Sequence, residues 1–199
     1  MGGVTARLAS QNPNKARELA HALPGWRIEL LDVEAMPPEE GSSYYENARA
    51  KALFGRARAA PGEWTLGEDS GVEVVGLRGA PGLHSARWAD DGVARVLDEL
   101  RGVEGEGRRA RFVCELVGIS PEGEELRGTG ILEGRIVQER RGSEGFGYDP
   151  IFVPDGEERT VAELGNAWKA QNSHRARAAR AFLAAISGRK TTPWRVKPK

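Results

Sequence analysis

The first third of the chain alternates between the short period of a β-strand and the longer period of an α-helix. Residues 4–10 predict a short strand that ends in a polar loop. Residues 14–23 predict a helix, because apolar side chains recur along one helical face. The positions on that face are Ala16, Leu19, Ala20 and Leu23. Pro24-Gly25 ends the helix, and residues 28–33 predict a second strand.

The middle of the chain continues this alternation. Ser43 and Glu46 match a capping box and predict a helix that runs to about residue 60. Residues 64–66 and 72–77 are apolar runs on either side of an acidic stretch. We interpret them as two strands joined by a polar turn.

The next stretch predicts a helix and then a hairpin. Asp90 or Asp91 can cap a helix that carries an apolar face. Residues 108–119 alternate apolar and polar positions and predict the clearest strand of the chain. A Pro-Glu-Gly turn leads into a second strand at residues 126–137, so we expect an antiparallel pair.

The last quarter predicts a short buried strand and a final helix. The strand covers residues 151–153, and the helix runs from about 173 to 187. Thr160 and Glu163 form a second capping-box match. Early alternation of helices and strands with a late hairpin predicts an α/β fold with a mixed sheet. We expect a single domain at residues 1–190, followed by a basic tail at 191–199.

The composition excludes several classes of protein. The 199 residues carry 29 basic and 29 acidic side chains, and zero net charge argues against a general nucleic-acid binder. A single cysteine, Cys114, rules out an internal disulfide and suits a reducing compartment. The chain begins without the pattern of a signal peptide and contains no apolar run of membrane-spanning length. We therefore expect a cytoplasmic protein with no membrane or nucleic-acid partner.

Two adjacent carboxylates, Glu68 and Asp69, lie between the two apolar runs and are followed by Ser70 and Gly71. Like charges side by side repel, and a shared divalent cation is a common reason for such a pair. The alternative is a polar turn with solvated carboxylates and a glycine that takes a positive φ.

A polar loop joins the first predicted strand to the first helix. Backbone N–H groups and the helix dipole favour an anion there, and a lysine adds a full charge. The loop residues are Ser10, Gln11, Asn12, Pro13, Asn14 and Lys15. Their spacing is not that of a Walker A loop. The alternative is a helix cap beside a solvated lysine.

A second polar cluster follows in the next loop and helix. Glu39 and Glu40 lie in the loop, and Asn47 is four residues before Lys51, so that pair shares a helix face. For Lys51 the alternative is a solvated surface lysine.

The loop Gly145-Phe146-Gly147-Tyr148-Asp149-Pro150 is the most unusual stretch of the chain. Glycines on both sides of Phe146 leave its ring faces open for stacking on a nucleobase. Asp149 precedes a proline, which favours an extended geometry in which its carboxylate can accept hydrogen bonds. The alternative is a glycine turn with a phenylalanine in the core.

Lys169, His174 and Arg175 place several donors near the N-terminus of the final helix. Cations at the positive end of a helix oppose its dipole, which favours a functional role over surface bases beside a serine cap. Together with the acids and the open aromatic ring, these donors suit a nucleotide with Mg²⁺. No serine or cysteine has a paired base, so attack by water is the simplest chemistry.

The ordered set of motifs resembles the inosine triphosphate pyrophosphatases, which remove non-standard purine nucleoside triphosphates. The matching stretches, in the order of that family, are Ser10-x-Asn12-x-x-Lys15, Glu39-x-Gly41-x-Ser43-Tyr44-x-Glu46-Asn47-Ala48-x-x-Lys51-Ala52, Asp69-Ser70-Gly71-x-Glu73-Val74, Gly79-Ala80-Pro81-Gly82-x-x-Ser85-Ala86-Arg87, Gly145-Phe146-Gly147-Tyr148-Asp149-Pro150-Ile151-Phe152 and Lys169-x-x-x-Ser173-His174-Arg175. They cover nearly the whole chain apart from the tail.

The resemblance implies a two-lobed α/β fold with a long mixed sheet, helices on its faces and a central substrate cleft, usually in a homodimer. It implies hydrolysis of ITP, dITP or XTP to the monophosphate and pyrophosphate with Mg²⁺. By position, Asp69 resembles the residue that serves this family as general base and metal-linked carboxylate. Glu39 resembles a metal ligand of the family, and Glu40 is the alternative. The residues implied to bind the triphosphate, here called the triphosphate grip, are Ser10 to Lys15, Lys51, Ser70 and Lys169. The residues implied to bind the base, here called the base pocket, are Phe146, Gly147, Tyr148, Asp149, His174 and Arg175. Glu68 departs from the usual aspartate, and we expect it to share the catalytic work with Asp69.

Selectivity for such substrates must depend on position 6 of the purine. Hypoxanthine and xanthine present an acceptor oxygen there, whereas adenine presents a donor amine. A pocket of donors would leave the adenine amine unpaired, and polar matching of this kind discriminates by about 10⁴-fold or more. Two alternatives stay open at this stage: a nucleotide-binding module without turnover, and an RNA-binding domain that uses the basic tail and the aromatic residues.

Overall fold

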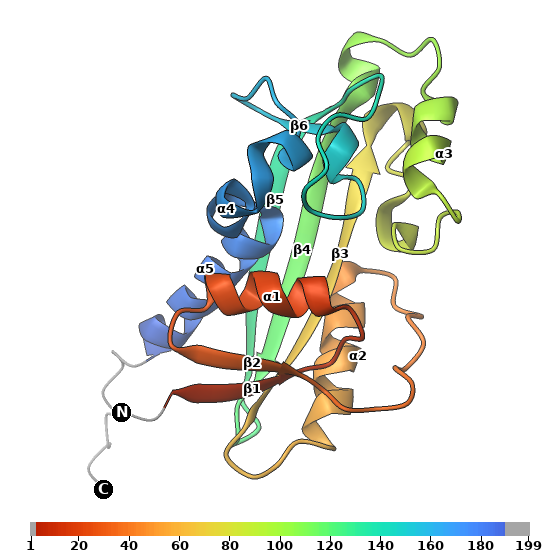
Figure 1. The fold of residues 1–199 in the computed structure, drawn as a ribbon. Helices are drawn as coiled ribbons and strands as arrows, with labels where there is room; N and C mark the ends of the chain where they lie inside the picture. The colour runs from red at the N-terminus through yellow and green to blue at the C-terminus, as the bar shows by residue number, and fades with distance from the viewer. Residues whose placement is uncertain (1–2, 190–199) are drawn as a thin grey trace, which may run out of the picture.

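A mixed six-stranded sheet organises the chain in the computed structural model, which describes residues 3–189 (Figure 1). The strand order is β2-β1-β3-β4-β5-β6. β1 pairs in parallel with β2 and β3, and β3 to β6 follow one another as antiparallel neighbours. The strands are β1 Val4–Leu8, β2 Trp26–Leu30, β3 Trp64–Val74, β4 Arg109–Ile119, β5 Glu125–Ile136 and β6 Phe152–Pro154. The predicted α/β class and mixed sheet are confirmed.

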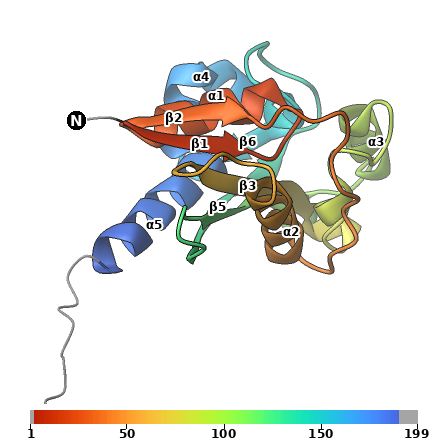
Figure 2. The ribbon, with the colours of Figure 1, turned by 90° about the horizontal axis from the view of Figure 1, so that it is seen from below.

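Helices cover both faces of the sheet. They are α1 Pro13–Ala22, α2 Tyr44–Arg56, α3 Gly92–Glu99, α4 Val161–Asn172 and α5 His174–Arg189. Short 3₁₀ turns occupy Val75–Leu77, Gly82–His84, Gly105–Arg108 and Asp149–Ile151. Figure 2 shows α1 packed along β2, with α4 beside it. Within residues 3–189, none of these helices is long and apolar enough to cross a bilayer.

α2 and α5 pack on opposite faces of β3. A Cβ on Gly67 would lie 1.9 Å from the carbonyl oxygen of Ala48 in α2. The face of β3 that carries Gly67, and with it Asp69, therefore packs against α2. On the other face, Leu66 belongs to an apolar cluster that includes Phe182 of α5. Because successive side chains of a strand point to opposite faces, the side chains of β3 alternate between the α2 side and the α5 side of the sheet.

Three apolar clusters build the core, and β3 passes through the two larger ones. Leu66 belongs to the cluster around α1 and α5, whereas Val72 belongs to the cluster around α3 and the far ends of β4 and β5. Glu68 and Ser70 lie between them on the same face of the strand. The polar segment of β3 therefore separates two regions of core.

The acidic stretch is not a turn, and this prediction was wrong. β3 pairs continuously with β4 from Thr65↔Ile119 to Val74↔Ala110, so Glu68 and Asp69 lie inside one long strand. Gly71 suggested a turn, but a glycine is needed there because neighbouring backbone approaches closely: a Cβ on Gly71 would lie 2.3 Å from the Gly82 carbonyl oxygen. The predicted strand at 72–77 also ends early, since Val75–Leu77 is a 3₁₀ turn.

Other boundaries shift by a few residues. The second strand is Trp26–Leu30 rather than 28–33, and α2 ends at Arg56 rather than near residue 60. The first capping box is only half formed, because the Glu46 carboxylate accepts from Ser42 instead of the cap residue. The second capping box at Thr160, the Asp91 cap of α3 and the β4–β5 hairpin are confirmed. The predicted tail at 191–199 lies outside the described residues.

Candidate active site

Glu68 and Asp69 are neighbours in sequence but face opposite sides of the sheet. Glu68 contacts Arg175 of α5, and Asp69 contacts Lys51 of α2. β1 pairs with β3 only as far as Leu66, so the edge of β3 beyond that point is not covered by β1. The prediction that the two acids share one task does not match this geometry.

On the α5 face, the Glu68 side chain is fully buried and bound by two cations. Arg175 donates to its Oε1 at 2.8 and 3.1 Å, and Lys15 Nζ forms an ion pair with Oε2 at 2.7 Å. Burial acts to raise the pKa of Glu68, but Arg175 and Lys15 outweigh it and hold the pKa well below its usual value. Glu68 is thus ionised at neutral pH, and its partners come from the protein itself.

Arg175 is held on three sides. Besides Glu68, its guanidinium donates to Glu18 of α1 and, at 3.0 Å, to the Ser70 hydroxyl. Glu18 also pairs with Lys169 at 2.7 Å. Sequence reasoning missed Glu18. Its position three residues after Lys15 on one helix, which places the two side chains on the same side, was the available signal.

On the α2 face, Asp69 lies in a cluster of polar side chains. Lys51 Nζ donates to Asp69 Oδ1 at 2.9 Å, and the Asn47 amide donates to Oδ2 at 3.0 Å. Burial raises the pKa of Asp69, although Lys51 and Asn47 act against the rise. Glu39 also pairs with Lys51, whereas the side chain of Glu40 is exposed and forms no ion pair within residues 3–189. The structure therefore brings Glu39, not Glu40, beside Asp69.

The carboxylates of Glu39 and Asp69 meet at a single cation, the ammonium of Lys51. Carboxylate oxygens are the hard ligands that Mg²⁺ prefers, and Mg²⁺ usually takes one or two of them together with water and substrate phosphates. Within residues 3–189, no group of three or more acidic, histidine or cysteine side chains could hold a metal on its own. These two carboxylates fit the donor preference of Mg²⁺, and the remaining ligands would have to be water or oxygens of a bound anion.

The predicted anion loop joins β1 to α1. Asn12 caps the helix by accepting from the Asn14 N–H at 2.9 Å, and Pro13 occupies the first turn. Ser10 accepts from the Asn12 N–H at 3.1 Å, which tightens the loop. The Gln11 amide instead turns away to the Glu34 carbonyl oxygen at 3.2 Å.

A pocket of about 270 Å³ lies on the Glu68 side of the strand. Its walls come from the anion loop, β3, β4, the Phe146 loop and the start of α5. The lining residues include Asn12, Lys15, Ser70, Phe112, Phe146, Gly147, Tyr148, Asp149, Lys169, His174 and Arg175. All residues of the predicted base pocket therefore meet in one cavity with Asn12, Lys15, Ser70 and Lys169 of the predicted triphosphate grip, whereas Lys51 lies outside it.

The aromatic residues of this pocket are not all free. Lys169 Nζ lies 4.0 Å from the centre of the Phe146 ring, so the prediction that both ring faces are open was wrong. Asp149 is buried, pairs with Lys169 and accepts from the Phe146 N–H at 2.8 Å, which fixes the loop. Burial raises the pKa of Asp149, although Lys169 opposes the rise.

His174 stacks on Phe112 with ring centres 4.7 Å apart and lines the same pocket. Burial, and then the charge of Arg175, hold the pKa of His174 well below its usual value, so the ring is neutral. Its Nδ1 is buried and has no hydrogen-bond partner among the described residues. A polar ligand atom in the pocket could supply that partner.

Comparisons with known proteins agree with this arrangement. Residues 6–185 match the model of the Ham1 family. The chain belongs to the Ham1 family. The resemblance inferred from the motifs is thereby confirmed.

Curated relatives of this Ham1 chain are similar over most of its length. A dITP/XTP pyrophosphatase of Thermus thermophilus is 42% identical over 192 residues, which is 92% of each chain. The dITP/XTP pyrophosphatase of Deinococcus radiodurans is 42% identical over 187 residues, covering 89% of this chain and 90% of the relative.

Solved Ham1 structures share the fold. The Ham1 protein of Staphylococcus aureus is 32% identical with a TM-score of 0.76, covering 93% of this chain and 99% of that one. A dITP/XTP pyrophosphatase of Mycobacterium abscessus is 38% identical with a TM-score of 0.69, covering 92% and 97%.

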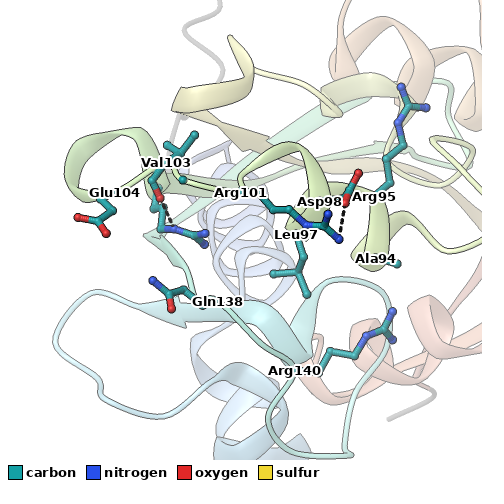
Figure 3. Close-up of a pocket in the computed structure, with 11 residues that line it drawn as sticks. Ala94, Arg95, Leu97, Asp98, Arg101, Val103, Glu104, Gln138 and Arg140 are labelled. Carbon is teal, nitrogen blue, oxygen red and sulfur yellow. Dashed lines mark hydrogen bonds and ion pairs between the residues drawn. The ribbon is translucent and has the colours of Figure 1, made fainter.

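Figure 3 shows a larger pocket of this Ham1 chain, about 860 Å³, between α3 and the segment that follows β5. Its arginines already have partners: Arg101 pairs with Asp98, Arg140 with Asp91, and Arg95 with Glu99. Arg108 donates to backbone carbonyl oxygens, among them that of Val103. None of the residues lining this pocket belongs to the matching motifs, whereas most of those lining the smaller pocket beside β3 do, so the larger pocket is the weaker candidate for a nucleotide.

Proposed function

We infer that this chain hydrolyses the non-standard purine nucleoside triphosphates ITP, dITP and XTP to the monophosphate and pyrophosphate. The inference rests on the similarity to dITP/XTP pyrophosphatases over about nine-tenths of the chain. The observation that carries it is the division of β3, with a carboxylate–lysine cluster on one face and an aromatic, polar pocket on the other. Such a pair of sites suits a ligand with a polyphosphate and a base.

Asp69 is the proposed general base. Its raised pKa makes it a stronger base than an ordinary exposed carboxylate, and Asn47 and Lys51 fix its orientation. Glu39 and Asp69 are the proposed ligands of Mg²⁺, which when bound would neutralise charge on the phosphate oxygens. Lys51 lies between these carboxylates and adds a fixed positive charge where the leaving pyrophosphate gains charge.

The triphosphate grip is proposed to be the Ser10–Lys15 loop with Lys51 and Ser70. The loop offers the N-terminal N–H groups of α1, which favour an anion. Lys15 is bound to Glu68, so its ammonium is held at the edge of the pocket rather than free in solvent. A lysine positioned in advance loses less conformational entropy when a phosphate arrives.

Base selectivity is proposed to rest on neutral His174 and the Phe146–Asp149 loop, which Lys169 holds in place through Asp149. The 6-oxygen of hypoxanthine or xanthine can accept from these donors, whereas the 6-amine of adenine cannot. Arg175 is engaged by Glu68, Glu18 and Ser70, so we assign it to orienting the pocket rather than to direct donation.

The proposal also covers the lobes of the molecule, its oligomeric state and its location. The two core regions on either side of the polar segment of β3 support two lobes with the substrate between them, in a single unit at residues 1–190. A homodimer and a cytoplasmic location are proposed on the sequence resemblance and composition alone.

The decisive assay is pyrophosphate release with Mg²⁺ from ITP, dITP, XTP, GTP and ATP. We expect turnover of the first three to exceed that of ATP by about 10⁴-fold, because polar matching at position 6 is lost with adenine. Equal turnover of all five would remove the selectivity claim. Binding of ITP without product after long incubation would favour the non-catalytic alternative.

Phe146→Ala tests the base pocket. We expect KM for ITP to rise by about 5- to 100-fold, because stacking of a base on an aromatic ring contributes about 1–3 kcal/mol. Affinity for pyrophosphate should not change. Phe54→Ala is the matched control, since Phe54 also carries a cation over its ring, Arg58 at 3.7 Å, but lies on α2 outside the pocket. An unchanged KM in Phe146→Ala would place the base elsewhere.

A further inference from the structure

Arg87 lies beside the proposed metal ligands and has no role in the mechanism above. Its guanidinium donates to the Glu39 carboxylate, and a second N–H lies 3.5 Å from the Glu39 carbonyl oxygen. The segment that carries Arg87 is anchored to the site by Ser85. The Ser85 hydroxyl accepts from the Val72 N–H at 2.9 Å, and the Ser85 carbonyl oxygen accepts from the Tyr148 hydroxyl at 3.0 Å.

Four charges cancel in this cluster. Glu39 and Asp69 supply two negative charges, and Lys51 and Arg87 supply two positive ones. A divalent cation that reaches Glu39 must therefore displace a cation of the protein.

Lys51 and Arg87 differ in how firmly they are held. The Lys51 side chain is only 8% exposed and also binds Asp69 and the Glu68 carbonyl oxygen. The Arg87 side chain is 45% exposed, and among the described residues its side chain has only Glu39 as a partner. Exposed ion pairs are weak, so Arg87 is the cation that can leave at low cost.

We propose that Arg87 is a positioning residue that holds the Glu39 carboxylate until substrate arrives. Arg87 then releases this carboxylate to the divalent cation and attracts the polyphosphate oxygens. This inference rests on the proposed function of the same site. Arg87 thus opposes binding of the metal alone, because both are cations competing for Glu39. It favours binding of the metal together with a polyphosphate, which brings more negative charge than the metal cancels.

The two effects have opposite signs, which a merely structural role would not produce. For Arg87→Gln we expect Mn²⁺ to bind the nucleotide-free protein about 3-fold more tightly, as loss of a weak competing ion pair implies. Pyrophosphate in the presence of Mn²⁺ should bind about 10-fold more weakly, as loss of a charged hydrogen bond implies. Arg87→Lys keeps the charge and should lie close to the wild type in both.

The experiment measures free Mn²⁺ by electron paramagnetic resonance and pyrophosphate binding by calorimetry. Arg95→Gln is the matched control, because Arg95 is also 45% exposed and paired with a glutamate, Glu99, but lines the other pocket (Figure 3). Weaker Mn²⁺ binding in Arg87→Gln, or unchanged pyrophosphate affinity, overturns the proposal. Turnover of ITP by the wild type is measured in parallel, so failure of the proposed function would be seen separately.

Discussion

Asp69→Asn is expected to lower kcat for ITP by about 10³-fold, since a positioned general base typically contributes about 10²- to 10⁴-fold. Asparagine has nearly the same shape, so it keeps the packing against Lys51 and Asn47 but cannot take a proton from water. We expect the folded state to survive, because burial opposes the charge of Asp69 and the neutral amide removes that penalty. The measurement is steady-state pyrophosphate release, with thermal unfolding of the same preparation.

Glu115→Gln is the control for this variant. Glu115 lies opposite Asp69 on β4, is also buried, and pairs with Arg127 at the surface instead of with the cluster. We expect its kcat to stay within a few-fold of the wild type. If Asp69→Asn retained more than about a tenth of the wild-type kcat, a base contributing the expected factor would have to be sought elsewhere.

Glu68→Gln is expected to have the largest effect on stability. The change leaves Arg175 and Lys15 without their shared counter-ion in a buried site. Breaking a buried ion pair typically costs about 3–5 kcal/mol, which for a chain of this size lowers Tm by about 6–20 °C. Activity should fall as well, because both cations lose the carboxylate that positions them. Thermal unfolding by circular dichroism measures the shift.

The acid dependence gives a second readout. Because the pKa of Glu68 is lowered in the folded protein, its charge contributes stability that is complete above the ordinary carboxyl pKa and is lost as pH falls toward the folded value. The difference in stability between wild type and Glu68→Gln should therefore shrink in acid. Glu73→Gln, on the same strand but paired with Arg111 near the surface, should cost less than about 1 kcal/mol at any pH. Equal losses in both variants would contradict the assigned role of Glu68.

Much of the fold could be predicted, because the caps and the apolar pattern that specify a helix or a hairpin lie within that element. The alternation in β4, the cap at Asp91 and the capping box at Thr160 each act within a few residues, and each prediction is confirmed. The strand β3 was misread for the opposite reason. Gly71 and the polar residues before it have the composition of a turn, and only the distant backbone of the Gly82 segment requires a glycine at this place in a strand.

The site was predictable as a set of residues but not as an arrangement. The motifs indicated Asp69, Lys51 and the Phe146 loop, yet sequence alone could not show that Glu68 and Asp69 serve opposite faces. That division depends on the alternation of a strand, which the misread turn concealed. Glu18 was missed and Arg87 was given no role, because each acts through a partner far along the chain, Arg175 and Glu39 respectively.

The alternation of β3 also bears on how such a protein can change. The groups proposed to choose the base and the groups proposed to cut the phosphate chain are reached from different sides of one strand, a single peptide unit apart. Substitutions around His174 and Phe112 can therefore be selected for a new base without altering the side chains around Asp69. A mutant library confined to the α5 face would vary the base that is accepted, while the residues proposed to carry out hydrolysis stay the same.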